Sequence, residues 1–210
     1  MLLDTPLCDF GWQAPDFTLL DPDGHAFTLS GHVGDKGLLI MFICNHCPCV
    51  QAIASRLAAD TRTLIDEGIQ VTAVMSNDYR SVPSDSPANM KRFAAQHGFA
   101  FPYLVDEDQA VGRAVRTVCT PDFFGFNKNG ELQYRGRLDD ARAGNGTPRQ
   151  HELLDAMLQI ALTGKGPNVK SRAWVARSNG AERAAVAPNR ANHTNFPHPQ
   201  RASALLTEPR

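Results

Sequence analysis

The sequence predicts an α/β domain with a mixed central sheet between layers of helices. Three observations carry this prediction. Apolar runs of strand length alternate with segments whose apolar residues recur at helical spacing, which is the order of β-α-β units with parallel strands. An Asn-Gly turn at 128–130 joins two later strands as an antiparallel hairpin. A turn at 21–24 joins two short strands near the start of the chain, which adds an N-terminal β-hairpin.

Each element has a local signal. Continuous apolar runs are typical of strands that are buried on both faces. Pro48 favours the first position of a helix, and Gly68 favours its end. Asp85-Ser86-Pro87 indicates a second helix start, with a capping side chain before the proline. The expected order is two strands within 16–29, a strand at 37–43, a helix at 48–68, a strand at 69–76, a helix from 85, a strand at 101–106, a short helix at 108–116, strands at 122–127 and 131–136, and a helix at 151–162.

Composition excludes several classes of function. The 210 residues carry 21 Lys and Arg against 22 Asp and Glu, a net charge of −1, which does not suit a nucleic-acid partner. We expect no membrane association, because no apolar stretch approaches the ~20 residues that span a bilayer. Five cysteines, an odd number without a signal-peptide pattern, indicate a reducing, cytoplasmic location.

The chain is long enough for one full domain. From about residue 177 it becomes rich in Pro, Asn and Ala and loses any sustained period. We therefore expect a folded domain over residues 1–176 and a disordered tail over 177–210.

Three of the five cysteines fall in "CNHCPC", residues 44–49, directly after a predicted buried strand. Because Pro48 favours the first helical position, Cys47 is the expected N-cap residue. There the backbone N–H groups and the positive end of the helix dipole favour thiolate over thiol. Cys47 is therefore the best placed nucleophile of the cluster.

The neighbours of Cys47 have different expected roles. Cys44 stands at C-x-x-C spacing, which permits a small disulfide ring. Cys49 lies two residues into the helix and points to another face, so it is a poorer partner. His46 is a candidate to stabilise the thiolate as an imidazolium, and the alternative is a solvated loop histidine. "VCTPDFF" places Cys119, Thr120 and Pro121 ahead of a strand, where a cis-proline or an ordinary turn proline fits.

Taken together, these segments resemble a known family. "APDFTLLDPDGHAFTL", "FICNHCP", "SND", "DSPANM", "FPYLVDE", "CTPDFF" and "YRGRLDD" resemble the thioredoxin fold, and the long N-terminal hairpin is similar to its peroxiredoxin-like, AhpC/TSA-related redoxin branch. The resemblance covers roughly residues 11–165. It implies a cis Pro121 that faces the active-site cysteine and shapes the substrate groove, with Cys119 close to Cys47.

The sequence also departs from that family. Val50 stands where thioredoxins carry the second cysteine, so Cys44 is the expected substitute. Peroxiredoxins have a threonine three residues before their cysteine, and Cys44 and Met41 occupy those places here. Relatives end in a Gly-Cys-Ser-Ile-Lys-Trp segment, whereas this chain has Trp174 without a cysteine.

Three functional hypotheses follow. The first is a thiol–disulfide oxidoreductase, in which Cys47 attacks a protein or small-molecule disulfide and Cys44, or Cys119, resolves the mixed disulfide. The second is a thiol peroxidase that forms a sulfenic acid on Cys47. Both need an external thiol reductant such as a thioredoxin and no bound cofactor, and the oligomeric state is not predicted.

The third hypothesis is a copper or zinc module that uses Cys44, His46, Cys47 and Cys49. A second distant ligand pair, usual in structural zinc sites, is absent from the sequence. A scaffold with spectator thiols is the non-catalytic alternative.

Other polar residues are candidates to line the cleft. Asn77 and Asp78 follow a strand at the same edge as Cys47. Asp139 and Asp140 are an acid/base candidate pair, although a solvated turn is the favoured interpretation.

Overall fold

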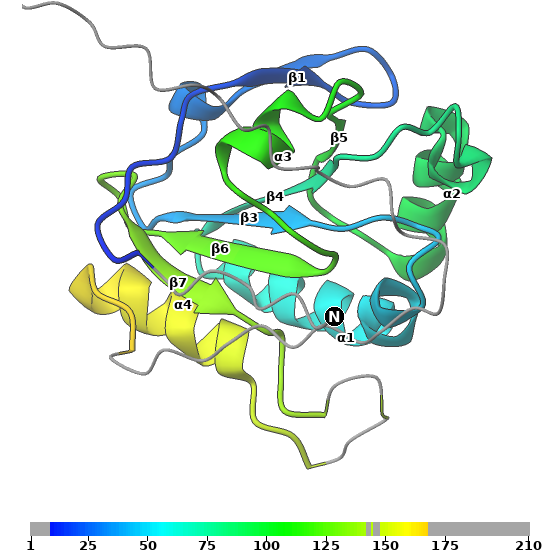
Figure 1. Cartoon of the computed structure of the whole chain (residues 1–210). Helices are drawn as coiled ribbons and strands as arrows, with labels where there is room; N and C mark the ends of the chain where they lie inside the picture. Colours follow the sequence, from blue (N-terminus) through cyan, green and yellow to red (C-terminus); the bar gives the residue numbers. More distant parts are fainter. Residues whose placement is uncertain (1–8, 142–143, 145–147, 168–210) are drawn as a thin grey trace, which may run out of the picture.

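The apolar runs of the sequence form one mixed sheet of seven strands in the order β2-β1-β5-β4-β3-β6-β7 (Figure 1). The computed structural model describes residues 9–141, 144 and 148–167. The tail predicted at 177–210 and the ends of the predicted 1–176 domain lie outside these residues, as do Trp174 and the fifth cysteine, Cys8.

Every predicted element is present within the described residues. The strands and helices are β1 (Thr18–Leu20), β2 (Ala26–Thr28), η1 (Leu29–Gly31), β3 (Leu38–Phe42), α1 (Pro48–Asp66), β4 (Gln70–Met75), η2 (Pro83–Asp85), α2 (Pro87–His97), β5 (Tyr103–Val105), α3 (Ala110–Ala114), β6 (Asp122–Phe126), β7 (Leu132–Gly136) and α4 (Glu152–Thr163).

The centre of the sheet is parallel and its flanks are antiparallel. β3, β4 and β5 run parallel, while β6 and β7 form the predicted hairpin and β6 lies antiparallel to β3. β1 joins the N-terminal hairpin to β5. All five residues of β3 are buried, as expected for a strand covered on both faces.

Helices cover both faces of this sheet (Figure 1). One apolar cluster packs α1, α2 and α4 against one face, and includes the fully buried Leu57, Met90 and Met157. A second cluster lies on the other face under α3 and the N-terminal hairpin, and includes Phe27 and Val111. The three-layer α/β/α architecture with an added N-terminal hairpin is therefore confirmed. No helix among the described residues is long and apolar enough to cross a membrane.

The start of α2 differs from the sequence prediction in one respect. Ser86 is the N-cap residue before Pro87, as expected, but its side chain makes no capping hydrogen bond. The neighbouring Asp85 does not cap the helix either, because its carboxylate accepts hydrogen bonds from the segment that carries the cysteines. The helix therefore begins without a side-chain cap.

The register of the sheet determines which loops meet. Phe42, the last residue of β3, lies beside Val74 of β4 and opposite Asp122, the first residue of β6. The segments that follow β3 and β4 and the segment that precedes β6 therefore gather at one edge. This edge holds the cysteine cluster.

Candidate active site

Cys47 lies at the N-terminus of α1, as the sequence predicts. It is the N-cap residue, with extended backbone angles (φ −69°, ψ 119°), and Pro48 opens the helix. Its thiol is buried, with 6% of the residue exposed. Its sulfur makes no capping hydrogen bond of normal geometry, but the N–H groups of Val50 and Cys49 still act on its charge.

Cys44 and Cys47 have pKa values shifted in opposite directions. A hydrogen bond from Cys44 is the main cause that lowers the pKa of Cys47 to about 5, against the opposing effect of burial, and Thr120 lowers it further. The same bond to Cys47, and then burial, raises the pKa of Cys44 far above its ordinary value. Near neutral pH the Cys47 sulfur is therefore a thiolate and Cys44 is its thiol donor.

Thr120 contacts both sulfurs. The Cys44 sulfur and the Thr120 hydroxyl share a hydrogen bond of 3.2 Å. The Cys47 sulfur lies 3.4 Å from the Thr120 carbonyl oxygen, which accepts a hydrogen bond from the protonated thiol. The Thr120–Pro121 peptide bond is cis, as the family resemblance implies.

Cys119 lies in the same segment but differs electrostatically from Cys47. Burial, and then the nearby charge of Asp122, raise the pKa of Cys119 to about 12, and charge on Cys47 and Cys49 acts in the same direction. Its thiol therefore stays protonated at neutral pH. The four cysteines of the described residues form no disulfide with one another.

His46 pairs with a carboxylate that the sequence did not assign to the site. Its Nδ1 lies 2.6 Å from Asp85 Oδ2, and its side chain is 28% exposed while that of Asp85 is fully buried. The predicted role of His46, as an imidazolium beside the thiolate, stays a prediction.

Asp85 is the hub of the loop that carries the cysteines. Its Oδ1 accepts hydrogen bonds from the backbone N–H groups of Asn45 (2.8 Å) and His46 (3.2 Å). Its Oδ2 accepts one from Asn77 Nδ2 at 3.0 Å. The only sequence signal that could have found it is its place after β4, at the edge where ligand-binding loops gather.

Asn45 receives further support from the sheet and from α1. The Tyr103 hydroxyl donates to Asn45 Oδ1 (3.1 Å), and Gln51 donates to the Asn45 carbonyl (2.8 Å). Burial, together with charge on Cys44, raises the pKa of Tyr103 well above its ordinary value, so it stays a neutral donor. The loop is thus fixed by hydrogen bonds from three separate elements.

The other polar candidates have mixed outcomes. Asn77 reaches the site through Asp85, but Asp78 is turned into its own loop, where it accepts bonds from the Arg80 N–H and the Ser81 hydroxyl. The solvated turn expected at 139–140 is wrong for Asp139. That carboxylate is buried, because Arg56 Nε and Arg149 Nη1 each donate to it at 2.8 Å.

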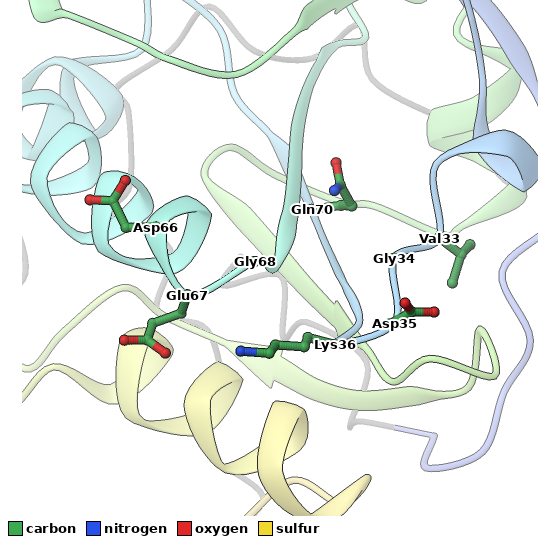
Figure 2. Close-up of a pocket in the computed structure, with 8 residues that line it drawn as sticks. All are labelled: Val33, Gly34, Asp35, Lys36, Asp66, Glu67, Gly68 and Gln70. Carbon is green, nitrogen blue, oxygen red and sulfur yellow. The ribbon is translucent and has the colours of Figure 1, made fainter.

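Figure 2 shows a hollow in the surface of the protein, formed by segments that carry none of the cysteines. It opens at the beginning of β3 and the end of α1, lined by Lys36, Asp66, Glu67, Gln70 and their neighbours. Gln70 pairs with Leu38, at the opposite ends of the strands from Phe42. None of the predicted site residues lines it.

Comparison with known proteins places the chain in a family. Residues 10–135 match the family model described as the AhpC/TSA family, and this span is more than half of the chain. The chain belongs to the AhpC/TSA family. Its fold is that of the thioredoxin-like redoxins, as the sequence predicts.

The relatives of this AhpC/TSA-family protein include both characterised and uncharacterised proteins. This chain is 27% identical over 123 residues to the thiol-disulfide oxidoreductase ResA of Geobacillus kaustophilus. The match covers 59% of this chain and 66% of that protein. The crystal structure of an uncharacterized conserved protein from Geobacillus kaustophilus is 36% identical, with TM-score 0.76 over 86% of this chain and 98% of that one. A hypothetical protein from Sinorhizobium meliloti 1021 is 33% identical, with TM-score 0.75 over 84% and 100%.

Proposed function

We propose that this protein is a thiol–disulfide oxidoreductase with Cys47 as nucleophile and Cys44 as resolving thiol. The observation that carries the proposal is the unequal pair of thiols at the start of α1, one with a lowered pKa and one with a raised pKa. A reactive thiolate beside a protonated partner is the arrangement that disulfide exchange requires. The similarity to ResA supports the same class of reaction.

The proposed reaction has three balanced steps. The Cys47 thiolate attacks one sulfur of a substrate disulfide, a mixed disulfide forms, and the other substrate sulfur leaves as a thiolate. Cys44 then loses its proton and attacks the Cys47 sulfur, which forms a Cys44–Cys47 disulfide and releases the second substrate sulfur as a thiol. An external dithiol reductant, such as a thioredoxin, supplies two electrons and two protons to restore both thiols.

The surroundings of the pair suit this reaction. Cys119 is a weaker candidate for the resolving thiol, because the hydrogen bond that lowers the pKa of Cys47 comes from Cys44. The Thr120–Pro121 segment, which contacts both sulfurs, forms the wall where the substrate docks. The substrate is a protein or small-molecule disulfide, and we place the reaction in the cytoplasm, where a reduced pair is maintained.

The peroxidase hypothesis has less support from the structure. The threonine expected three residues before the cysteine is replaced by Cys44. A peroxide therefore meets a reactive thiolate without the threonine of the peroxiredoxin pattern.

One experiment separates these functions. Reduced, metal-free protein is mixed with a peptide disulfide or with one equivalent of hydrogen peroxide, and the products are mapped by mass spectrometry. We expect a mixed disulfide on Cys47 that persists in Cys44→Ser and converts to a Cys44–Cys47 disulfide in the unaltered protein. Cys49→Ser is the matched control and should behave as the unaltered protein.

The opposite result is equally clear. A fast reaction with peroxide that gives sulfenic acid on Cys47, together with slow disulfide exchange, would establish the peroxidase instead. If Cys47 reacts neither with the peptide disulfide nor with hydrogen peroxide faster than Cys49 does, both redox functions are excluded.

A further inference from the structure

Three different metal-ligand side chains lie together beside the reactive thiol. Cys44 Sγ, a ring nitrogen of His46 and a carboxylate oxygen of Asp85 all lie within 4.8 Å of one another. They come from two separate segments, the loop after β3 and the turn η2. We propose that the reduced protein binds one zinc ion through Cys44, His46 and Asp85.

The chemistry of the donors selects the ion. A thiolate, an imidazole and a carboxylate are the three ligand types that zinc accepts, whereas magnesium and calcium take oxygen ligands almost alone. Three protein ligands leave a fourth position open around a tetrahedral ion. The donors around such an ion lie about 3.4 Å apart. Donors up to 4.8 Å apart must therefore approach one another by up to about 1.4 Å, whereas His46 Nδ1 and Asp85 Oδ2, now 2.6 Å apart, must separate.

Two of the three ligands are buried, and hydrogen bonds from neighbouring groups hold one of them in place. Cys44 and Asp85 are buried to about 1% exposure or less, so an ion there would be removed from bulk water. Hydrogen bonds from Asn77 and from the backbone N–H of Asn45 hold the Asp85 carboxylate in place. Outer partners of this kind orient metal ligands.

His46 gives an ion access from solvent, and its hydrogen bond to Asp85 is the contact that an ion would replace. Its side chain is 28% exposed, so an ion can approach it from solvent. The Nδ1–Oδ2 hydrogen bond of 2.6 Å holds a proton between His46 and Asp85. Zinc would displace that proton and the Cys44 thiol proton. The ring nitrogen of His46 and the carboxylate oxygen of Asp85 would then bind the ion instead of each other.

The inferred set differs from the one that the sequence suggested. Asp85, which is 39 residues from His46, takes the place of the predicted ligands Cys47 and Cys49. Neither of these two cysteines belongs to the close donor group. The difference matters for the experiment, because it makes Cys49→Ser a control that should keep the site.

Zinc binding has a functional consequence. A Cys44 sulfur that is bound to zinc cannot attack the mixed disulfide on Cys47. Zinc would then inhibit the resolving step, a consequence that rests on the proposed function, whereas the binding itself does not.

The test uses the full chain, reduced and stripped of metal. Zinc is titrated in competition with a chromophoric chelator, and cobalt(II) is used in parallel because its thiolate charge-transfer absorption reports sulfur ligation. We expect one ion per chain and a sulfur-to-cobalt band that is lost in Cys44→Ser. His46→Gln and Asp85→Asn should each weaken zinc binding at least about tenfold, the lower end of what the loss of an outer partner costs.

Three controls keep the result interpretable. Cys49→Ser and Asp78→Asn remove a thiol and a carboxylate of the same neighbourhood and should bind zinc as the unaltered protein does. Because the chain has seven histidines, the double variant Cys44→Ser/His46→Gln gives the background binding. Circular dichroism confirms that each variant is folded, and His46→Gln, at a partly exposed position, tests the site even if Asp85→Asn unfolds.

The proposal is overturned if the double variant binds zinc as tightly as the unaltered protein, or if neither His46→Gln nor Asp85→Asn weakens binding. Binding that depends only on Cys44 and Cys47 would also overturn it. Failure of disulfide exchange with intact zinc binding would contradict only the proposed function.

Discussion

At the scale of single residues, the opposite pKa shifts of Cys47 and Cys44 make Cys47 the thiolate of the pair near neutral pH. The hydrogen bond from Cys44 is the largest cause of the lowered pKa of Cys47, ahead of the backbone N–H groups at the start of α1. The sequence predicted the helix position correctly but not this order of causes. A C-x-x-C spacing shows that two sulfurs can meet, but it does not show which of them donates.

The first prediction concerns the pH dependence of Cys47. In metal-free protein the rate of its alkylation by iodoacetamide should stay high from pH 8 down to about 6 and halve near pH 5, where its pKa lies. Cys44→Ser should move the midpoint upward, because it weakens the largest cause of the shift. Mass spectrometry of the labelled peptide gives the rate. A midpoint near 9, the ordinary value for a thiol, would contradict the structure.

The same pKa makes a second prediction, for stability. The folded-state pKa lies below the ordinary value of 9.0, so the unfolded chain binds the extra proton between these values. The free energy of unfolding should therefore gain a contribution from Cys47 as pH rises from about 5 to 9, and lose it as pH falls through 5. Its slope is at most about 1.4 kcal/mol per pH unit. Urea unfolding of Cys47→Ser should show a flatter pH profile.

A third prediction tests Asp85 as the hub of the loop. Asp85→Asn replaces one acceptor oxygen by an N–H₂ group that faces donors, so at least one buried N–H loses its partner. Such a loss costs about 1–3 kcal/mol. The midpoint of urea unfolding should fall accordingly. Asp78→Asn, at an exposed position, is the control and should change stability by no more than about 0.5 kcal/mol. If the two substitutions lower stability equally, Asp85 does not hold the loop as argued.

At the scale of elements, a buried ion pair positions the segment that contacts both sulfurs. Asp122 begins β6 directly after Pro121, and its carboxylate accepts bonds from Arg135 of β7 and from the Thr117 hydroxyl. Burial raises the pKa of Asp122, and Arg135 opposes this shift. Arg135 also donates to the Arg116 carbonyl and stacks on Phe124. The β6–β7 hairpin thus supports the segment from α3 to β6.

The fourth prediction follows from that pair. Arg135→Leu leaves the Asp122 charge buried without its partner and should cost about 3–5 kcal/mol. The double variant Arg135→Leu/Asp122→Leu should recover part of the loss, because it removes both charges. Arg80→Leu is the control, since Arg80 is exposed and its pair with Glu107 contributes about 0–1 kcal/mol. Chemical unfolding of the four proteins measures the difference. A double variant less stable than Arg135→Leu would contradict the argument.

Elements and site residues differ in how far the sequence predicts them. Apolar periodicity, Pro48, Gly68 and the Asn-Gly turn specify the elements, because those signals act within a few residues. The same local signals place Cys47 at its N-cap. Asp85 and Asp139 could not be assigned, because each has donors far away in the chain. Asn45 and His46 lie 40 and 39 residues from Asp85, and Arg56 of α1 lies 83 residues from Asp139. A buried carboxylate is recognised only once its donors are known.

At the scale of the whole molecule, a charged cluster ties α1 to the segment that follows β7. Arg149 donates to Asp60 of α1 at 2.7 and 2.9 Å and to Asp139 at 2.8 Å, while Arg56 of α1 also donates to Asp139. Asp60 and Asp139 are buried, and Arg149 is nearly so. These residues are up to 89 positions apart in the chain. Their contacts hold the start of α4 on the helix that carries Cys47.

The last prediction removes this tie. Arg149→Met keeps a long apolar side chain but leaves two buried carboxylates short of a donor, so stability should fall by about 3 kcal/mol or more. Hydrogen exchange should quicken first in the N-terminal half of α4, whose contact with α1 depends on the cluster, and then in α1. Arg137→Met is the matched control, because Arg137 pairs with the partly exposed Glu152 and touches neither buried carboxylate. If exchange quickens equally in both variants, the cluster does not join the two helices. If it quickens in Arg149→Met alone while the alkylation rate of Cys47 is unchanged, the cluster supports the scaffold and leaves the thiol pair to its own loop.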